Sequence, residues 1–374
     1  MGSGVDARYG AAREISAAWL DLWGLRPKGP PIAQSPRDEL PLEGGARLLH
    51  FRPRPKASPP QASPPQAQAS QPQAAQPQAQ AQPPAILLVP SLINRWYVLD
   101  LRPGASLVEA LVSAGFDVWL LDWGIPEDED RYLDWDAVLR RLGRAVRRVR
   151  RETGRPELAL FGYCMGGTLT TIHAAQHPED LTALVTLAAP IDFSQGGMLR
   201  RMVDPSWFDA EAIADAGNVA PSQMQAGFTA LRPTLDAAKL VSMPDLVTDQ
   251  KARDAFLALE EWASDNIPFP GEAYRRYIGE LYQGNELVAG THRANGAPVS
   301  LAAIKCPVLA ITATRDAICP SPAAAALTRL VGSSDASVLE VPGGHVGAVV
   351  GSRAAKEMYP RLVQWLTPRT GLAS

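Results

Sequence analysis

The sequence has few cysteines, little net charge and no long apolar run, and each of these shortages excludes a class of protein. Three cysteines among 374 residues are too few, and odd in number, for a disulfide framework, so we expect a reducing compartment. A net charge of −3 implies no nucleic acid or other polyanion as partner. The first residues lack the basic start and apolar core of a secretory signal, and apolar stretches such as 183–191 are too short to span a bilayer. We therefore expect a cytoplasmic protein with no transmembrane segment.

Residues 52–84 lack the apolar side chains that a core requires. They are mostly Pro, Gln, Ala and Ser, which predicts a disordered, partly polyproline-II segment. The segment joins two predicted strands, 46–51 and 85–89, so we interpret it as an insertion in a surface hairpin. In the N-terminal part, 1–51, apolar residues at helical spacing predict an amphipathic helix over 11–24, which either packs on the main domain or faces a partner subunit.

The rest of the chain alternates short apolar strands with helices. Strands are predicted at 85–89, 117–121, 158–160, 181–188, 306–313 and 336–341. Helices are predicted at 106–114, 135–153, 168–175 and 352–366. This alternation is typical of an α/β fold with a mostly parallel sheet and helices on both faces. It covers 85–191 and 301–374. Between them, 192–300 is rich in aromatic residues, Met and Pro, and we interpret it as an inserted cap domain.

Residues 161–167, Phe-Gly-Tyr-Cys-Met-Gly-Gly, have the pattern of a nucleophile elbow, G-x-S-x-G, with cysteine in place of serine. Such a strand-turn-helix is too tight for side chains two residues before and after the nucleophile, and Gly162 and Gly166 meet that need. Cys164 would then sit on a strained apex, where the helix N-terminus favours a thiolate. A buried cysteine in an ordinary turn would show the same pattern. Whether Cys164 is a nucleophile therefore depends on finding the other members of a triad.

Of the five histidines, four are poorly placed to serve as the base for Cys164. His50 precedes the nucleophile on a strand, and His292 falls inside the inserted segment. His173 and His177 are on the helix that follows the elbow and point away from its apex. His345 remains, in a loop that leaves the last strand.

The acid that orients His345 should leave the penultimate strand, and Asp316 is there, whereas Asp335 lies at the wrong edge. The chain order Cys164, Asp316, His345 matches the nucleophile–acid–histidine order of α/β-hydrolases. This order at three separate strand ends predicts that fold and a Cys-Asp-His triad.

An oxyanion hole should combine two backbone amides. One is that of Met165, directly after the nucleophile. The other should come from the loop 90–95, which lacks the His-Gly-Gly pattern of lipases, and we assign it to Ile93.

Several segments resemble the polyhydroxyalkanoate synthases. Residues 90–101 resemble the family's segment with Ile-Asn, Tyr and Asp-Leu, 117–124 its next strand, and 162–167 its cysteine lipase-like box. Residues 343–347 match the family's histidine loop. Within the predicted cap, a similar pattern comprises Trp262, Asp265, Tyr282, Asn285, Leu287 and Gly290. The resemblance covers roughly 40–52 and 85–368, and the short N-terminal region resembles the class III catalytic subunit, which works with a second subunit.

The resemblance implies polymerisation of (R)-3-hydroxyacyl-CoA through an acyl thioester on Cys164, with CoA as substrate and leaving group and no metal or redox cofactor. It also implies a cytoplasmic location at the surface of a nascent polymer granule, a dimer and a second synthase subunit. Two features depart from the family. Ala317 stands where a histidine often follows the acid, and the insertion 52–84 has no counterpart.

Two other functions fit the same residues. A cysteine hydrolase, such as a thioesterase or a dienelactone-hydrolase-like enzyme, would use the same triad. An inactive granule-associated or complex-forming protein would keep the fold alone, although the intact triad speaks against it.

Overall fold

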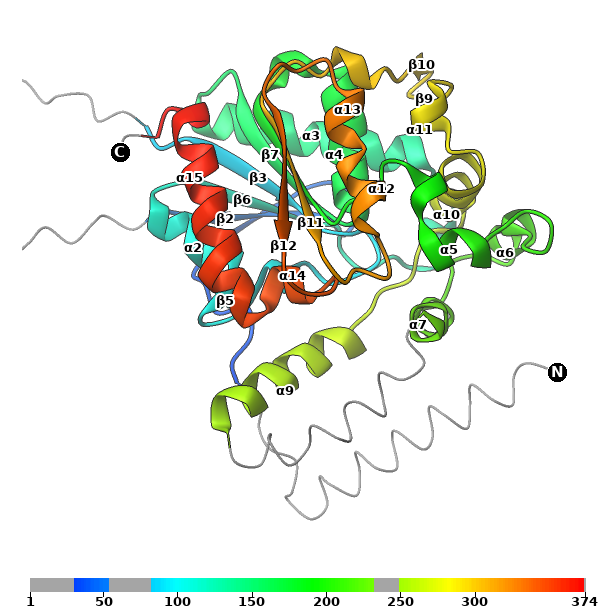
Figure 1. Cartoon of the computed structure of the whole chain (residues 1–374), viewed down its shortest axis with the longest axis horizontal. Helices are drawn as coiled ribbons and strands as arrows, with labels where there is room; N and C mark the ends of the chain where they lie inside the picture. The colour runs from blue at the N-terminus through cyan, green and yellow to red at the C-terminus, as the bar shows by residue number, and fades with distance from the viewer. Residues whose placement is uncertain (1–29, 54–81, 232–248, 373–374) are drawn as a thin grey trace, which may run out of the picture.

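A central sheet of eight strands organises the part of the chain that the computed structural model describes, residues 30–53, 82–231 and 249–372 (Figure 1). The strands, in spatial order, are β1 (Asp38–Pro41), β2 (Arg47–Phe51), β6 (Asp117–Asp122), β3 (Ala85–Val89), β7 (Leu158–Tyr163), β8 (Leu181–Leu187), β11 (Val308–Ala313) and β12 (Ala336–Val341). The first two pairings are antiparallel, and every pairing from β6 to β12 is parallel. Two short ribbons, β4 (Asp100–Arg102) with β5 (Ala105–Ser106) and β9 (Arg293–Ala294) with β10 (Ala297–Pro298), lie outside this sheet. The predicted mostly parallel sheet is confirmed.

Helices cover both faces of the sheet, as predicted. The core helices are α2 (Leu107–Ala114), α3 (Trp135–Thr153), α4 (Met165–Gln176), α12 (Ser321–Ala325), α13 (Leu327–Leu330), α14 (Gly347–Val350) and α15 (Tyr359–Thr370). Short 3-10 helices are η1 (Trp96–Leu99), η2 (Asp128–Tyr132), η3 (Pro178–Asp180) and η6 (Leu301–Ala303), and η7 (Ala354–Met358) is a π-helix. Successive side chains of β3 point to opposite faces of the sheet. Leu87 packs in the core with α3 and α4, whereas Ile86 and Leu88 pack in the core with α2 and α15. A strand buried on both faces reads as an unbroken apolar run, which is why β3 was recognisable.

The prediction that residues 52–84 are inserted in a surface hairpin is wrong in its strand pairing. β2 and β3 are not neighbours, because β6 lies between them and pairs with both. All but the first residue of β6 are buried, so each of its edges needs a strand partner, and β2 supplies one of them in antiparallel direction. The hairpin that β2 does form is with β1, which is also the first strand of the sheet and was not predicted. β1 is short and largely exposed, and it carries no apolar alternation.

The ends of the predicted helices agree with their capping residues. α3 has the predicted bounds, with Asp134 accepting from the amide of Ala137 and Gly154 in the left-handed region at its end. α2 begins one residue after the predicted start because Ser106 is its N-cap, accepting from the amide of Glu109 at 2.9 Å. The last helix continues past its predicted end at residue 366, to Thr370. The predicted helix 11–24 and nearly all of the 52–84 insertion lie outside the described residues.

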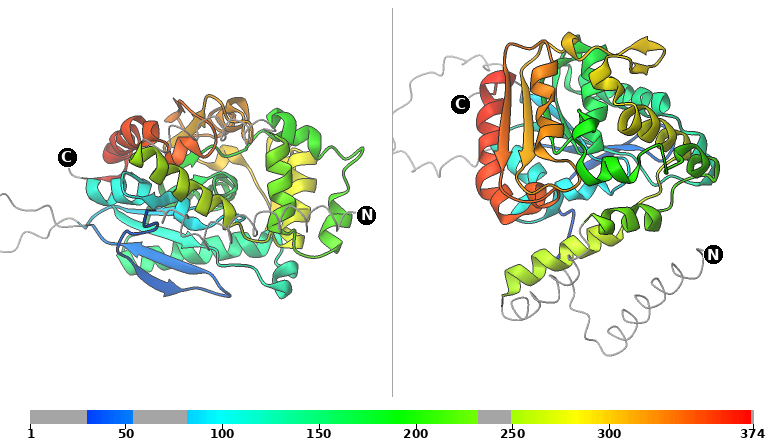
Figure 2. Two further views of the ribbon diagram at one scale, coloured as in Figure 1. Left: turned by 90° about the horizontal axis from the view of Figure 1, so that it is seen from below. Right: turned by 45° about the vertical axis from the view of Figure 1, so that its right-hand side comes forward.

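The described part of the segment between β8 and β11, residues 188–231 and 249–307, is largely helical. It contains η4 (Phe193–Gln195), α5 (Gly197–Met202), α6 (Ala210–Asp215), α7 (Pro221–Ala230), α9 (Gln250–Ser264), α10 (Gly271–Arg276), the π-helix η5 (Tyr277–Gln283) and α11 (Glu286–Ala289). Helices α7 and α9 lie at the end of the molecule toward which β11 and β12 point (Figures 1 and 2). The indole of Trp262 donates to the carbonyl oxygen of Arg95 at 3.0 Å, and Tyr97 donates to Asp265 at 2.7 Å. The segment is thus tied to the loop and helix that follow β3.

Among the helices in the described ranges, none is both long enough and apolar enough to cross a membrane.

Candidate active site

Cys164 stands at the sharp turn from β7 into α4. Its backbone has φ 54° and ψ −127°, a conformation that residues with side chains rarely adopt and that costs on the order of 1–3 kcal/mol. Two hydrogen bonds hold it there. The Cys164 amide donates to the carbonyl oxygen of Leu187 in β8, and the Cys164 carbonyl oxygen accepts from the Gly167 amide, both at 2.9 Å. The turn therefore presents the thiol at the carboxyl end of the central strands.

The two glycines that flank Cys164 are required by packing. A Cβ on Gly162 would collide with the Thr170 hydroxyl and with the backbone of α4. A Cβ on Gly166 would collide with the carbonyl oxygens of Val89 and Pro90, at the end of β3. The predicted tight turn is therefore present, and its glycines allow β7, α4 and the end of β3 to approach one another.

Asp316 and His345, predicted from chain order, are in contact. Nδ1 of His345 lies 2.7 Å from Oδ2 of Asp316, where it donates to the carboxylate. The other oxygen of Asp316 accepts from the amides of Ile318 and Cys319 at 2.9 and 2.8 Å. The two side chains are 9% and 0% exposed. With its carboxylate held by three donors, Asp316 fixes the ring and leaves Nε2 free to face the thiol.

The charges around His345 set its protonation. Burial lowers the pKa of His345, but the negative charges of Cys164 and Asp316, together with hydrogen bonds to both, raise it by more, so the net pKa is raised. The ring of Tyr163 packs beside the imidazole, with centroids 5.3 Å apart. This arrangement favours the protonated, imidazolium form of His345.

Cys164 opens onto a cavity of about 300 Å³. Ile93 and Met165, the predicted oxyanion residues, line it beside the thiol, and their role stays a prediction. Most of the remaining wall comes from the segment between β8 and β11, including Phe208, Met224, Phe228 and Phe269. A larger cavity, of about 500 Å³, lies between β2 and α2, and its lining holds none of the predicted site residues. The chemistry and the apolar cavity coincide at Cys164.

The other histidines near the sheet have partners of their own. His50 lies 2.6 Å from Asp117 and stacks on Trp119, with ring centroids 3.9 Å apart. His173 is buried beside Asp180. Neither lines the cavity around Cys164. The elimination that selected His345 agrees with these positions.

Three polar residues of the cavity wall were not predicted as part of the site: Tyr277, Tyr282 and Cys319. Burial raises the pKa of each of them well above its usual value, and the charge of Cys164 raises it further. Tyr277 and Tyr282 are brought together by the π-helix η5, with ring centroids 5.4 Å apart. Their spacing of five residues matches the i→i+5 hydrogen-bond spacing of a π-helix and not the i→i+4 spacing of an α-helix, so α-helical periodicity could not reveal it. Tyr282 was noticed solely through the family resemblance.

Comparisons with known proteins agree with the fold. Residues 84–352 match the family model described as the alpha/beta hydrolase fold. Similar solved structures include a hydrolase from Pseudomonas aeruginosa PA01 (TM-score 0.52, 15% identity, covering 89% of this chain and 99% of that one). Another is a soluble variant of monoglyceride lipase from Saccharomyces cerevisiae (TM-score 0.52, 14% identity, covering 89% and 96%). At such identities the likeness shows the fold alone.

The most informative relatives are curated proteins named poly(3-hydroxyalkanoate) polymerase subunit PhaC. The one from Allochromatium vinosum is 35% identical over 293 residues, which cover 78% of this chain and 82% of that protein. The one from Haloferax mediterranei is 36% identical over 289 residues, which cover 76% of this chain and 59% of that longer protein. The chain therefore belongs to the alpha/beta-hydrolase fold family and, within it, to the poly(3-hydroxyalkanoate) polymerase PhaC family.

Proposed function

We propose that the chain polymerises (R)-3-hydroxyacyl-CoA into polyhydroxyalkanoate, with release of CoA, through an acyl thioester on Cys164. The observation that carries this proposal is the placement of Cys164. It stands on a strained turn beside the His345–Asp316 pair and opens into an apolar cavity. Relatives named as polymerases supply the substrate class.

In the first step, His345 takes the thiol proton and the Cys164 sulfur attacks the thioester carbonyl. A new C–S bond forms to Cys164 and the C–S bond to CoA breaks, with the proton passing from His345 to the departing CoA sulfur. The exchange of one thioester for another is nearly balanced, so the acyl group stays activated. The amides of Met165 and Ile93 would stabilise the tetrahedral oxyanion.

In the second step, His345 changes from acid to base. Acylation removes the negative charge from the Cys164 sulfur, the largest of the influences that raise the pKa of His345. Burial still lowers the pKa of His345, so without the charge on sulfur that pKa falls. A neutral His345 can accept the proton of a 3-hydroxyl group, whose oxygen attacks an acyl thioester carbonyl. An ester bond forms, the C–S bond of that thioester breaks, and the sulfur leaves as a thiol after taking up the proton from His345, so the chain grows by one unit.

Water has to be kept from the thioester, or the enzyme would hydrolyse it. The aromatic and Met side chains from 192–300 surround the cavity at Cys164, and we propose that this segment acts as the cap over the site. The proposed reaction uses a CoA thioester as its substrate and requires no metal or redox cofactor.

The proposal extends to the setting of the enzyme. We place it in the cytoplasm at the surface of a nascent polymer granule, as a class III-like catalytic subunit that forms a dimer and works with a second synthase subunit. The match of 82% of the Allochromatium vinosum protein, itself named a subunit, supports this part.

Incubation with (R)-3-hydroxybutyryl-CoA tests the function. We expect CoA together with polymer, and an increase in rate when a companion subunit is added. Free 3-hydroxybutyrate without polymer would instead support a cysteine hydrolase, which would use the same Cys164, Asp316 and His345.

A matched pair of cysteine variants tests the mechanism. Cys164→Ala should abolish CoA release, whereas Cys306→Ala, which changes a half-buried cysteine that does not line the cavity, should retain it. CoA release that survived Cys164→Ala would overturn the thioester mechanism. No CoA release from the unaltered chain, alone or with its companion, would support an inactive complex-forming protein.

A further inference from the structure

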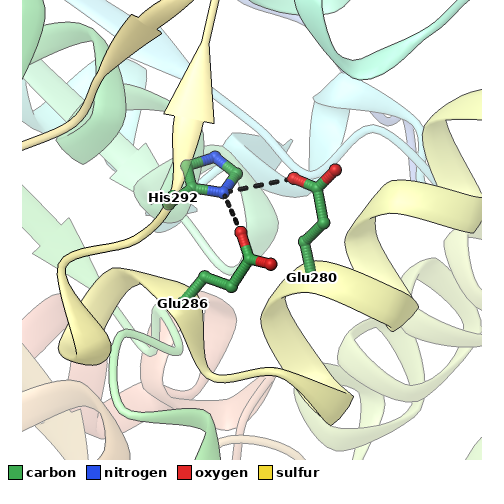
Figure 3. A group of neighbouring side chains, drawn as sticks. All are labelled: Glu280, Glu286 and His292. Carbon is green, nitrogen blue, oxygen red and sulfur yellow. Dashed lines mark ion pairs between the residues drawn. The ribbon is translucent and has the colours of Figure 1, made fainter.

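Three side chains of the segment between β8 and β11 converge on one point (Figure 3). Glu280 lies on the π-helix η5, Glu286 begins α11, and His292 directly precedes β9. One potential ligand atom from each lies within 4.8 Å of the others. None of the three takes part in the chemistry assigned to Cys164.

His292 is the distinctive member of this cluster. It is 0% exposed, and neither of its ring nitrogens makes a hydrogen bond with any described residue. Nδ1 points at both carboxylates, 3.3 Å from Oε2 of Glu280 and 3.5 Å from Oε2 of Glu286 (Figure 3). A buried ring nitrogen that faces two carboxylates and makes a hydrogen bond with neither suggests that all three groups bind a common ligand.

The two distances fit ligands that share a metal ion. An N–H···O hydrogen bond spans about 2.7–3.2 Å. Ligands at about 2.0–2.2 Å from a tetrahedral zinc ion lie about 3.3–3.5 Å from each other. Both measured separations, 3.3 and 3.5 Å, fall in the second range.

The surrounding charge also suits a divalent cation. Arg276 donates to both oxygens of Glu280, from Nε to Oε1 at 2.7 Å and from Nη2 to Oε2 at 3.0 Å, and it donates to Asp136 through Nη1 at 2.8 Å. Glu280, Glu286 and Asp136 thus bring three carboxylates against the one guanidinium of Arg276, which leaves an excess of two negative charges. A doubly charged ion would balance that excess.

We propose that Glu280, Glu286 and His292 bind a zinc-like divalent cation, with water completing its coordination. An imidazole with two carboxylates suits zinc, whereas magnesium prefers six oxygen ligands. The ion would join η5, which carries Tyr277 and Tyr282 of the cavity wall, to the chain entering β9. Its role is then structural, holding one wall of the cavity in place.

Zinc binding to the full-length chain tests the proposal. The Cys164→Ala variant is used throughout, so that the nucleophile cannot hold the metal, and it is first treated with a chelator. Titration with zinc chloride, followed by calorimetry, should give one ion per chain and a higher melting temperature. His292→Gln and Glu286→Gln should each weaken binding by about 100-fold or more, since even changes outside the first ligand shell cost 10–100-fold. The control His177→Gln alters an exposed histidine beside Glu179 and should bind zinc unchanged.

The outcomes separate cleanly. No zinc uptake by the Cys164→Ala chain, or uptake by both ligand variants as tight as that of the Cys164→Ala chain, would overturn the site and leave an ion pair between His292 and the two carboxylates. Glu286 is 31% exposed, so Glu286→Gln is expected to fold even where His292→Gln does not. Circular dichroism without zinc verifies the fold of each variant, and Glu286→Gln decides the case if His292→Gln is unfolded.

Discussion

His345 and His292 both face carboxylates, but at different distances, and the distances separate their roles. At the carboxyl end of the core strands, Nδ1 of His345 lies 2.7 Å from Asp316, and amides hold the other oxygen of that acid. In the segment between β8 and β11, Nδ1 of His292 lies 3.3 and 3.5 Å from two carboxylates. The first geometry suits an oriented base and the second a shared ion. The same residue types thus support different chemistry according to how closely the backbone brings them together.

The largest effect is expected from a change at Asp316, the partner of His345. Asp316→Asn should lower the rate of CoA release by about 10⁴-fold, because the amide can no longer hold the required tautomer of His345. The amides of Ile318 and Cys319 can still donate to the side-chain oxygen, so the fold should persist. The control Asp335→Asn alters a partly exposed acid that pairs with Arg369 and should keep the wild-type rate. Equal losses in both variants would contradict the role of Asp316.

The second prediction contrasts the two histidines directly. At a zinc concentration of about 100 times the dissociation constant, binding should stabilise the fold by about 2.7 kcal/mol. His345→Gln in the Cys164→Ala chain should keep this stabilisation, whereas His292→Gln should lose it, as measured by thermal unfolding with and without zinc. The reverse pattern would place the ion at the His345–Asp316 pair.

The third prediction concerns the rigidity of the two regions. Gly166→Ala should destabilise the fold by about 1–3 kcal/mol, because the new Cβ meets the backbone after β3. Gly279→Ala, in η5, should cost little, since no described atom beyond its chain neighbours and the backbone of its own helix lies within 4 Å of the added Cβ. Urea unfolding of both variants measures the difference. A comparable loss at Gly279 would show that η5 is packed as tightly as the elbow.

The smallest effect is a change in protonation. Since the charge of Cys164 raises the pKa of His345, Cys164→Ala should lower that pKa below its value in the unaltered chain. Imidazolium would then give way to imidazole at a lower pH. NMR titration of the His345 ring measures this directly, with the His50 ring, bound to Asp117, as internal control. An unchanged His345 pKa would contradict the proposed change from acid to base on acylation.

Local patterns were sufficient where the structure depends on local sterics. The elbow could be identified because Gly162 and Gly166 occupy places that reject any Cβ. The contact between Asp316 and His345 could be predicted because parallel strands align their carboxyl ends on one edge of the sheet, where Cys164 also lies. The strand pairing of β2 could not, since an apolar strand does not specify which strand lies beside it, and the pairing with β6 joins distant residues.

What the sequence determined by itself was therefore the α/β alternation, the cysteine elbow and the order of its predicted triad, because short-range packing and chain direction control them. What the tertiary structure alone decided was which side chains from distant positions contact one another. Tyr277 and Tyr282 share a wall because η5 is a π-helix. His292 meets its two carboxylates because the chain passes through η5 and then turns at Asn285, with φ 47°, and at Gly290, with φ 70°. Neither the π-helical repeat nor these left-handed turns follow from the spacing of Glu280, Glu286 and His292, and their contact depends on the whole path of the backbone.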